Sequence, residues 1–163
     1  ALLALRRAAR ITTRFLVRDA FAFNRWGVLQ PGGTPESAAR QRAEFVANLD
    51  DADYALCARG LANCSIRLYE AISLGRIPLF VNTRCVLPYE WLVNWRSVCV
   101  CVDENELPHI ADILRDDHAR FTPSEFATRQ RLARELFERW IRPEGFFAEL
   151  HRHFPRAVSA VRA

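Results

Sequence analysis

A short polar loop leads into an apolar helix that carries one carboxylate, and this combination can bind a phosphorylated ligand. The residues that could contact such a ligand follow one another along the chain: Arg59, Gly60, Asn63, Ser65, Arg67 and Glu70. The free N–H groups and the dipole of a helix start favour an anion such as a diphosphate. Arg67 adds a guanidinium fork, and Glu70 lies one turn further along the same face. A nucleotide fits this pattern, with its phosphates at the helix start and its ribose hydroxyls on the carboxylate.

Each of these residues also has an ordinary structural explanation. Asn63 or Ser65 could simply cap the helix, because both residue types are common caps. Arg67 and Glu70 are three residues apart and could form a weak surface ion pair. Gly60 could serve only to let the backbone turn.

The site residues need a scaffold, and the hydrophobic patterns predict an α/β fold. Strands are predicted at residues 13–22, 54–57, 77–81 and 97–102. Helices are predicted at residues 1–10, 36–50, 65–74, 88–93, 107–115, 122–140 and 144–153. Alternating strands and helices followed by closing helices are typical of a Rossmann-like, doubly wound parallel sheet flanked by helices. Ligands in such sheets bind beyond the carboxyl ends of the strands, so loops 58–64 and 82–87 should form the site.

Composition narrows the class of protein. The chain has 163 residues, of which 50% are hydrophobic and 26% charged, as expected for a single globular domain. All 23 cationic residues are arginine, which reflects either codon bias or phosphate binding. They are scattered without a dense patch, so a nucleic-acid partner is not expected. No apolar stretch reaches the roughly 18 residues of a membrane span. Because the first residue is not methionine, we expect a fragment of a longer chain.

The five cysteines predict free thiols. Their odd number argues against a closed disulfide framework, and without a CxxC pair a zinc site is not expected. Cys99 and Cys101 should face the same side of a predicted strand, where buried thiols are the usual state. Free thiols are consistent with a reducing compartment, although one disulfide of the Cys57–Cys85 type remains an alternative.

The stretch from Asp53 to Trp95 resembles the exostosin-like glycosyltransferases. The matching segments are DYALCARG (53–60), SIRLYEAI (65–72), GRIPL (75–79), LPY (87–89) and NW (94–95). The resemblance covers roughly residues 45–114, and more loosely residues 13–140. Residues 1–163 are accordingly interpreted as a single nucleotide-sugar-binding domain.

The resemblance implies one half of a GT-B fold, in which two Rossmann-like halves enclose a cleft. This chain would be the donor-binding carboxy-terminal half of an inverting enzyme that moves a sugar from a UDP-sugar to a glycan acceptor, with no cofactor and no bound metal. Carried over by position, Glu70 would hold the ribose, and Ser65 and Arg67 would face the diphosphate. Arg59 and Gly60 would line the same loop.

The resemblance also leaves parts of the enzyme open. The acceptor-binding half and the first strand of the donor half have no counterpart in the chain, and the catalytic base is unknown. The compartment would be the cytoplasm in a bacterium and the Golgi lumen in a eukaryote. A non-catalytic nucleotide-binding or scaffold domain that partners an active transferase is the alternative, and an unrelated flavodoxin-type phosphate-binding module is a third. Retention of Ser65, Arg67 and Glu70 together favours the enzyme, because a scaffold needs none of them.

Overall fold

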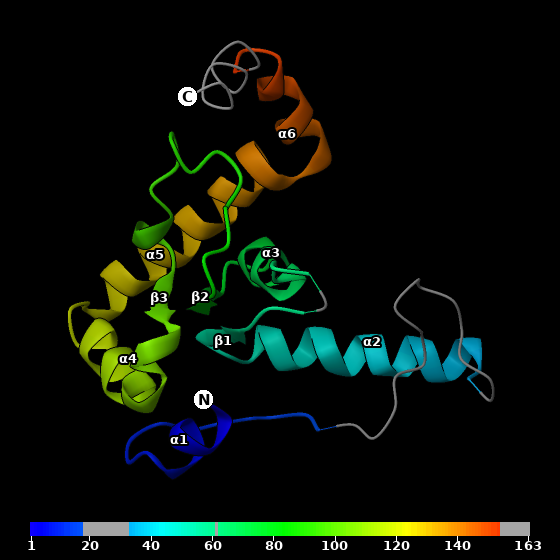
Figure 1. Ribbon diagram of the computed structural model, residues 1–163. Coiled ribbons are helices and arrows are strands. Elements are labelled where there is room, and N and C mark those ends of the chain that lie inside the picture. The colour runs from blue at the N-terminus through cyan, green and yellow to red at the C-terminus, as the bar shows by residue number, and fades with distance from the viewer. Residues whose placement is uncertain (18–32, 61, 154–163) are drawn as a thin grey trace.

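A three-stranded parallel sheet lies at the centre of the computed structural model, which describes residues 1–17, 33–60 and 62–153 (Figure 1). Its strands are β1 (Tyr54–Cys57), β2 (Ile77–Asn82) and β3 (Val100–Asp103), in the spatial order β1–β2–β3. Residues 77–81 are all buried, as their unbroken apolar run predicts for a strand covered on both faces.

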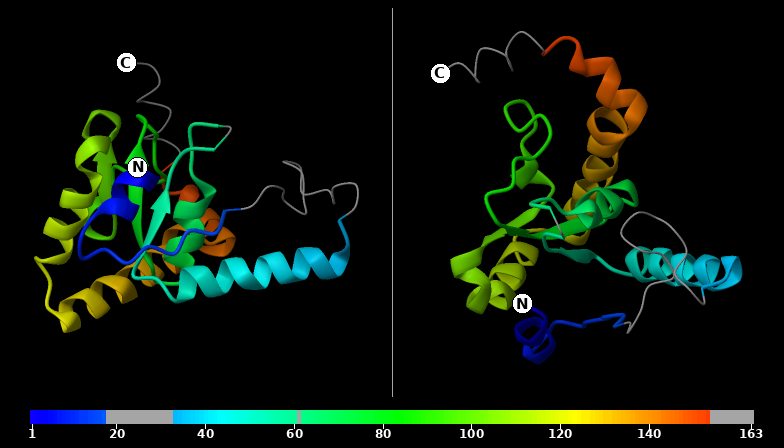
Figure 2. Two further views of the ribbon diagram at one scale, coloured as in Figure 1. Left: turned by 90° about the horizontal axis from the view of Figure 1, so that it is seen from below. Right: turned by 45° about the vertical axis from the view of Figure 1, so that its right-hand side comes forward.

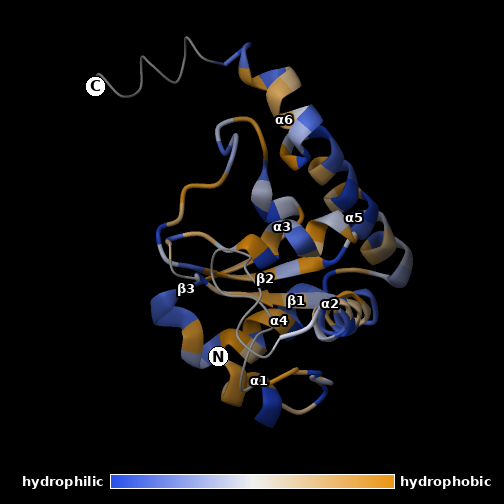
Figure 3. Ribbon diagram, turned by 90° about the vertical axis from the view of Figure 1, so that its right-hand side faces the viewer, coloured by the Kyte–Doolittle hydropathy of each residue, from blue (hydrophilic) through white to orange (hydrophobic). Residues whose placement is uncertain are grey.

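Helices cover both faces of the sheet (Figure 3). One face packs against α3 (Ile66–Ser73) and α5 (Pro123–Leu136). The other face packs against α4 (Ile110–His118), with α1 (Leu2–Arg7) beside it. The predicted α/β class is therefore confirmed.

The remaining helices lie outside these two layers. α2 (Pro35–Asp50) leads into β1 and extends away from the sheet (Figure 2). α6 (Pro143–Leu150) follows a π-helical turn at Phe137–Ile141, so the predicted closing helices are confirmed. Short 3-10 helices at Trp95–Ser97 and Glu104–His109 flank β3. No helix in the described part of the chain is long and apolar enough to cross a bilayer.

Local sequence signals start the two longest helices. Thr122 accepts a hydrogen bond from the Glu125 N–H (3.3 Å), and the Glu125 carboxylate accepts one from the Thr122 N–H (2.8 Å). Thr34 and Ser37 exchange the same pair of bonds at the start of α2. A proline occupies the first turn of each helix, where its missing N–H costs nothing.

Gly75 ends α3 in the left-handed conformation, with φ +68°. Its N–H donates to the Ile72 carbonyl at 3.0 Å. A Cβ at this position would lie 3.1 Å from the Gln130 carbonyl oxygen of α5. Gly75 therefore combines a backbone conformation that other residues adopt at a cost with a close approach between two helices.

Replacing Gly75 by alanine is expected to lower the free energy of unfolding by about 1–2 kcal/mol, because the left-handed conformation and the tight contact both disfavour a side chain. Urea titration followed by circular dichroism measures the change. Gly60→Ala is the matched control, since a Cβ there meets nothing within 4 Å and the φ is not positive. Its effect should stay within about 0.5 kcal/mol. Equal losses in both variants would contradict the explanation.

The predicted strand at residues 13–22 is wrong where the structure describes it. Residues 11–17 belong to no strand, and residues 18–22 lie outside the described residues. The segment is held by side chains instead: the Asn48 amide donates to the Arg14 carbonyl (3.0 Å), and Arg14 pairs with Asp51. A cavity separates it from β1, and a strand forms only where a neighbouring backbone takes its hydrogen bonds.

The predicted helix at residues 88–93 is a series of turns. Tyr89 has a φ of +53°, which a helix interior does not accommodate. Its hydroxyl donates to the Phe146 carbonyl at 2.7 Å, and the Trp95 indole N–H donates to the Pro88 carbonyl at 3.0 Å. The contact with the distant Phe146 and the one with the nearby Trp95 together hold this local conformation.

Two further boundaries move at the ends of β3. The strand predicted from residue 97 begins at Val100, because residues 95–97 form a 3-10 turn. The helix predicted at residues 107–115 begins only at Ile110, because Pro108 has no N–H to continue the helical ladder.

One charged side chain is built into the interior. Arg129 of α5 is 3% exposed, and its guanidinium donates to the Ser97 carbonyl (3.0 Å), the Cys99 carbonyl (3.2 Å) and the Asp117 carboxylate (2.6 Å). The Tyr54 hydroxyl donates to the same carboxylate at 3.3 Å. Burial, and then the Asp117 charge, raise the pKa of Tyr54. This network joins α5, α4 and the segment before β3.

Candidate functional site

The loop after β1 carries the first predicted site residues in an open position. The Gly60 N–H donates to the Cys64 carbonyl at 3.0 Å, which closes the loop. Arg59 and Gly60 are exposed, and within the described residues the Arg59 side chain makes no hydrogen bond or ion pair. Open space surrounds the Gly60 Cα, so a ligand can approach the backbone closely there.

Asn63 ties this loop to the loop after β2. Its side-chain N–H2 donates to the Thr83 carbonyl (3.0 Å) and the Arg84 carbonyl (3.2 Å), and the Thr83 hydroxyl donates to its carbonyl oxygen. Asn63 therefore does not cap α3; it positions the two loops that the sequence predicts to form the site. A direct contact between Asn63 and a ligand stays a prediction.

Ser65 occupies the N-cap position of α3, but its side chain accepts no hydrogen bond from the helix. The residue is only 5% exposed. Within the described part of the chain, the backbone N–H groups of Ile66 and Arg67 also make no hydrogen bond. The start of α3 therefore presents one hydroxyl and two N–H groups that the described residues do not use.

Arg67 and Glu70 do not pair with each other, so the surface-ion-pair explanation is not what the structure shows. The Arg67 guanidinium lies over the Phe45 ring of α2, 4.8 Å from its centroid. Glu70 is half-buried, and its carboxylate has no hydrogen bond or ion pair among the described residues. Among the described residues neither side chain forms a hydrogen bond or ion pair, so both keep this capacity for a ligand.

The buried thiol of Cys57 shows where these two charges lie. Burial raises the pKa of Cys57 to about 12, the Arg67 cation lowers it, and the Glu70 carboxylate raises it. Cys57 is the last residue of β1. The two charged side chains therefore lie near the last residue of this strand, at the end where the sequence predicts the ligand.

Sequence reasoning missed two polar groups at the same edge of the sheet. The Asn82 amide at the end of β2 donates to the Asp103 carboxylate at the end of β3 (2.8 Å), and Thr83 bonds to Asn63 as described above. The Asp103 N–H also donates to the Glu106 carboxylate at 3.0 Å. These residues could have been found from their positions in the sequence, because each one follows a predicted strand.

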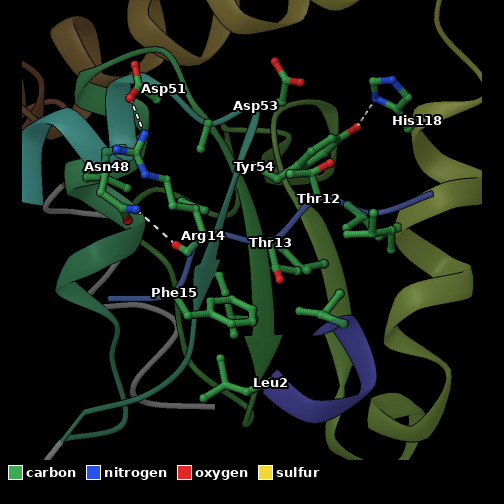
Figure 4. A pocket seen from close by; sticks show the side chains of 18 of the residues that line it. Leu2, Thr12, Thr13, Arg14, Phe15, Asn48, Asp51, Asp53, Tyr54 and His118 are labelled. Carbon is green, nitrogen blue, oxygen red and sulfur yellow. Dashed lines mark hydrogen bonds and ion pairs between the residues drawn. The ribbon is translucent and has the colours of Figure 1, made fainter. Parts of the chain in front are cut away.

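A cavity of about 1250 Å³ lies elsewhere, along the edge of β1 that pairs with no described strand (Figure 4). It is enclosed by α1, residues 9–17, the end of α2 and α4. Several polar groups in its wall bind one another, namely Arg14 with Asp51 and Asn48, and Tyr54 with His118 at 3.1 Å. Of the six predicted site residues only Arg67 reaches it. The predicted site is thus an open surface beyond the strand ends, and the cavity is a separate feature.

The arrangement at the start of α3 suits an anion with hydroxyl groups beside it. N–H groups at a helix start and a nearby guanidinium stabilise phosphate oxygens, and an ionised carboxylate accepts strong hydrogen bonds from hydroxyls. Within the residues that the structure describes, no group of three or more His, Cys, Asp or Glu side chains is placed to hold a metal ion.

Comparison with known proteins shows the family of the chain. The family model of the exostosin GT47 domain matches residues 28–116. Exostosin-1 of Drosophila melanogaster is 30% identical over 118 residues, which cover 71% of this chain and 15% of that protein. A probable beta-1,4-xylosyltransferase of Arabidopsis thaliana is 34% identical over 70 residues, 43% of this chain and 17% of that protein.

A third relative is a probable glucuronosyltransferase of Oryza sativa subsp. japonica, 33% identical over 70 residues, which are 43% of this chain and 17% of that protein. The chain thus spans 15% to 17% of the length of these relatives. The family match includes the whole run from β1 through β3, and it covers more than half of the sequence. On this evidence the chain belongs to the exostosin GT47 domain family.

Proposed function

We propose that this chain is the donor-binding half of an inverting glycosyltransferase that transfers a sugar from a UDP-sugar to a glycan acceptor. Family membership supports glycosyl transfer, and three similar proteins are named as an exostosin, a xylosyltransferase and a glucuronosyltransferase. The choice of UDP and the inversion rest on the resemblance of residues 53–95 to this family. The Rossmann-like sheet supports a GT-B arrangement with a second, acceptor-binding half.

The observation that carries the proposal is that Arg67 and Glu70 both lie near the Cys57 thiol, at the carboxyl end of β1, and do not pair with each other. An exposed i,i+3 pair would be a common surface feature with no ligand. Two opposite charges left free within one turn instead match the two ends of a nucleoside diphosphate, whose phosphates are anionic and whose ribose hydroxyls are donors.

The roles of the residues follow from their positions. The N–H groups of Ile66 and Arg67, together with the Ser65 hydroxyl, donate to the diphosphate. Glu70 accepts hydrogen bonds from the ribose. As the sugar–phosphate bond breaks, negative charge grows on the diphosphate, and these donors stabilise it more strongly in the transition state than in the bound donor. Transfer without a metal is part of the proposal.

The acceptor side of the reaction requires groups that this site does not contain. In an inverting displacement, the acceptor hydroxyl attacks the face of the sugar opposite the diphosphate. A general base within hydrogen-bond reach of that hydroxyl removes its proton. We propose that this base lies across the cleft, in the acceptor-binding half.

Titration calorimetry of the chain with UDP tests the proposal. UDP should bind, and ADP should bind at least about tenfold more weakly, which corresponds to about 1.4 kcal/mol. Uridine should bind more weakly than UDP as well, because it lacks the phosphates that the start of α3 would hold. If a folded chain bound neither diphosphate, the donor-site proposal would fail and a scaffold domain that partners an active transferase would be the better explanation.

A further inference from the structure

The loops after β1 and β2 each carry one cysteine, and the two loops are fastened side by side. Cys64 follows Asn63 and Cys85 follows Arg84, and the Asn63 side chain donates to the Arg84 carbonyl at 3.2 Å. The Cys85 N–H in turn donates to Asn82 at 3.3 Å, which fixes the turn at the end of β2. The residues that precede the two cysteines are therefore in direct contact.

The other cysteines are placed differently. Cys57 and Cys99 are 0% and 3% exposed, and Cys101 lies within β3. The Cys57 thiol donates to the Ala55 carbonyl at 3.2 Å, inside the core. Cys57, which the sequence left open as a disulfide partner of Cys85, is a free thiol in this structure, as is Cys85. Cys64 and Cys85 are both half-buried, so solvent reaches them.

The two thiols lie near each other and near the Tyr69 ring. Burial raises the pKa of Cys85, and the Cys64 thiol and the Glu90 carboxylate raise it further. Burial also raises the pKa of Tyr69 to about 12, with Cys85 and Cys64 adding to the effect. Both thiols therefore lie close enough to Tyr69 of α3 to affect its pKa, and the hydrogen bonds of Asn63 hold the two loops together.

We propose that Cys64 and Cys85 form a disulfide when the protein meets a low-molecular-weight disulfide such as oxidised glutathione. The thiolate of one cysteine attacks the small disulfide, forms a mixed disulfide and releases one thiolate of the small molecule. The second cysteine then attacks the protein sulfur of that bond and releases the other. Two protein thiols are oxidised and one small disulfide is reduced to two thiols, so atoms and electrons balance.

The local structure permits both cysteines to move. A disulfide requires the two Cα atoms to lie within about 7 Å. Neither Cys64 nor Cys85 belongs to a helix or strand, so both can shift without breaking ladder hydrogen bonds. The bond would close a loop that contains α3 and β2 and would fix the entrance to the start of α3 covalently. This inference does not depend on the proposed function.

Tryptic mapping of the oxidised chain tests the proposal directly. The reduced protein is incubated with oxidised glutathione, its remaining thiols are blocked with N-ethylmaleimide, and it is digested without a reductant. Because trypsin cuts after arginine, Cys57, Cys64 and Cys85 fall in the separate peptides 43–59, 60–67 and 85–96, and Cys99 and Cys101 share peptide 97–115. The expected product is peptide 60–67 joined to peptide 85–96, which separates on adding dithiothreitol.

Two variants make the result specific. Cys85→Ser should abolish the joined peptide and leave Cys64 as a mixed disulfide with glutathione, whereas Cys101→Ser should leave the joined peptide unchanged. Glutathione on both Cys64 and Cys85 without a joined peptide would overturn the proposal. So would a bond from either of them to peptide 43–59 or 97–115.

Discussion

Alanine in place of Glu70 should weaken UDP binding by about 100-fold or more while the domain stays folded. The proposed carboxylate accepts hydrogen bonds from the ribose hydroxyls, and each bond to a charged group contributes about 1.5–3 kcal/mol. Loss of two such bonds therefore removes at least about 3 kcal/mol of binding free energy. Titration calorimetry with UDP measures the loss.

The same variant should leave the free energy of unfolding within about 0.5 kcal/mol of the parent chain, because the Glu70 carboxylate has no hydrogen bond or ion pair among the described residues. Glu135→Ala on α5 is the matched control, since Glu135 is an exposed helical carboxylate far along the chain from the site. Glu70→Gln should recover part of the affinity through its carbonyl oxygen. If Glu70→Ala bound UDP as tightly as Glu135→Ala does, the ribose assignment would be wrong.

Local patterns were enough to predict much of the scaffold. The apolar run of β2, the left-handed Gly75 and the capping box at Thr122 each depend on neighbours within a few residues. Each feature has a local cause. The apolar run suits a strand buried on both faces, glycine has no Cβ to oppose the left-handed conformation, and the capping side chains bond to free N–H groups at the helix start. For this reason the α/β order of elements could be predicted without knowledge of the contacts.

Contacts between distant segments could not be predicted in the same way. Asn63 has the residue type of a helix cap, yet its amide bonds to Thr83 and Arg84, twenty residues or more away along the chain. Residues 88–93 have a helical start signal at Pro88, yet Tyr89 is drawn into a left-handed conformation beside Phe146. In both places tertiary packing overrides the local preference.

The candidate site was predicted as a set of residues but not as an arrangement. The sequence predicted Ser65, Arg67 and Glu70 on one helix start. The structure places that start after the loop that follows β1, and the described residues make no hydrogen bond to the N–H groups of Ile66 and Arg67. It also shows that Asn63 acts between loops, which spacing alone does not indicate. Ligand binding by these residues is a prediction that the Glu70 variant tests.

The buried Arg129 network is the feature whose loss should destabilise the fold most. Arg129→Ala is expected to lower the free energy of unfolding by about 3–5 kcal/mol, because it leaves the Asp117 carboxylate without its cation and the Ser97 and Cys99 carbonyls without their donor. In the sequence this residue is one of 23 arginines and nothing distinguishes it. Urea titration followed by circular dichroism measures the loss.

Arg131→Ala is the matched control, because it removes the same charge from an exposed position two residues away on the same helix. Among the described residues, Arg131 bonds only to the Thr128 hydroxyl, at 2.9 Å. Its effect should stay within about 0.5 kcal/mol. Arg129→Lys should recover little, since an ammonium group cannot reproduce the planar fork that reaches two carbonyls and a carboxylate together. A loss in Arg129→Ala no larger than that in Arg131→Ala would mean that the network does not hold α5 to α4. In that case the apolar contacts of α3 and α5 with the sheet would have to hold these two helices on their face of the sheet.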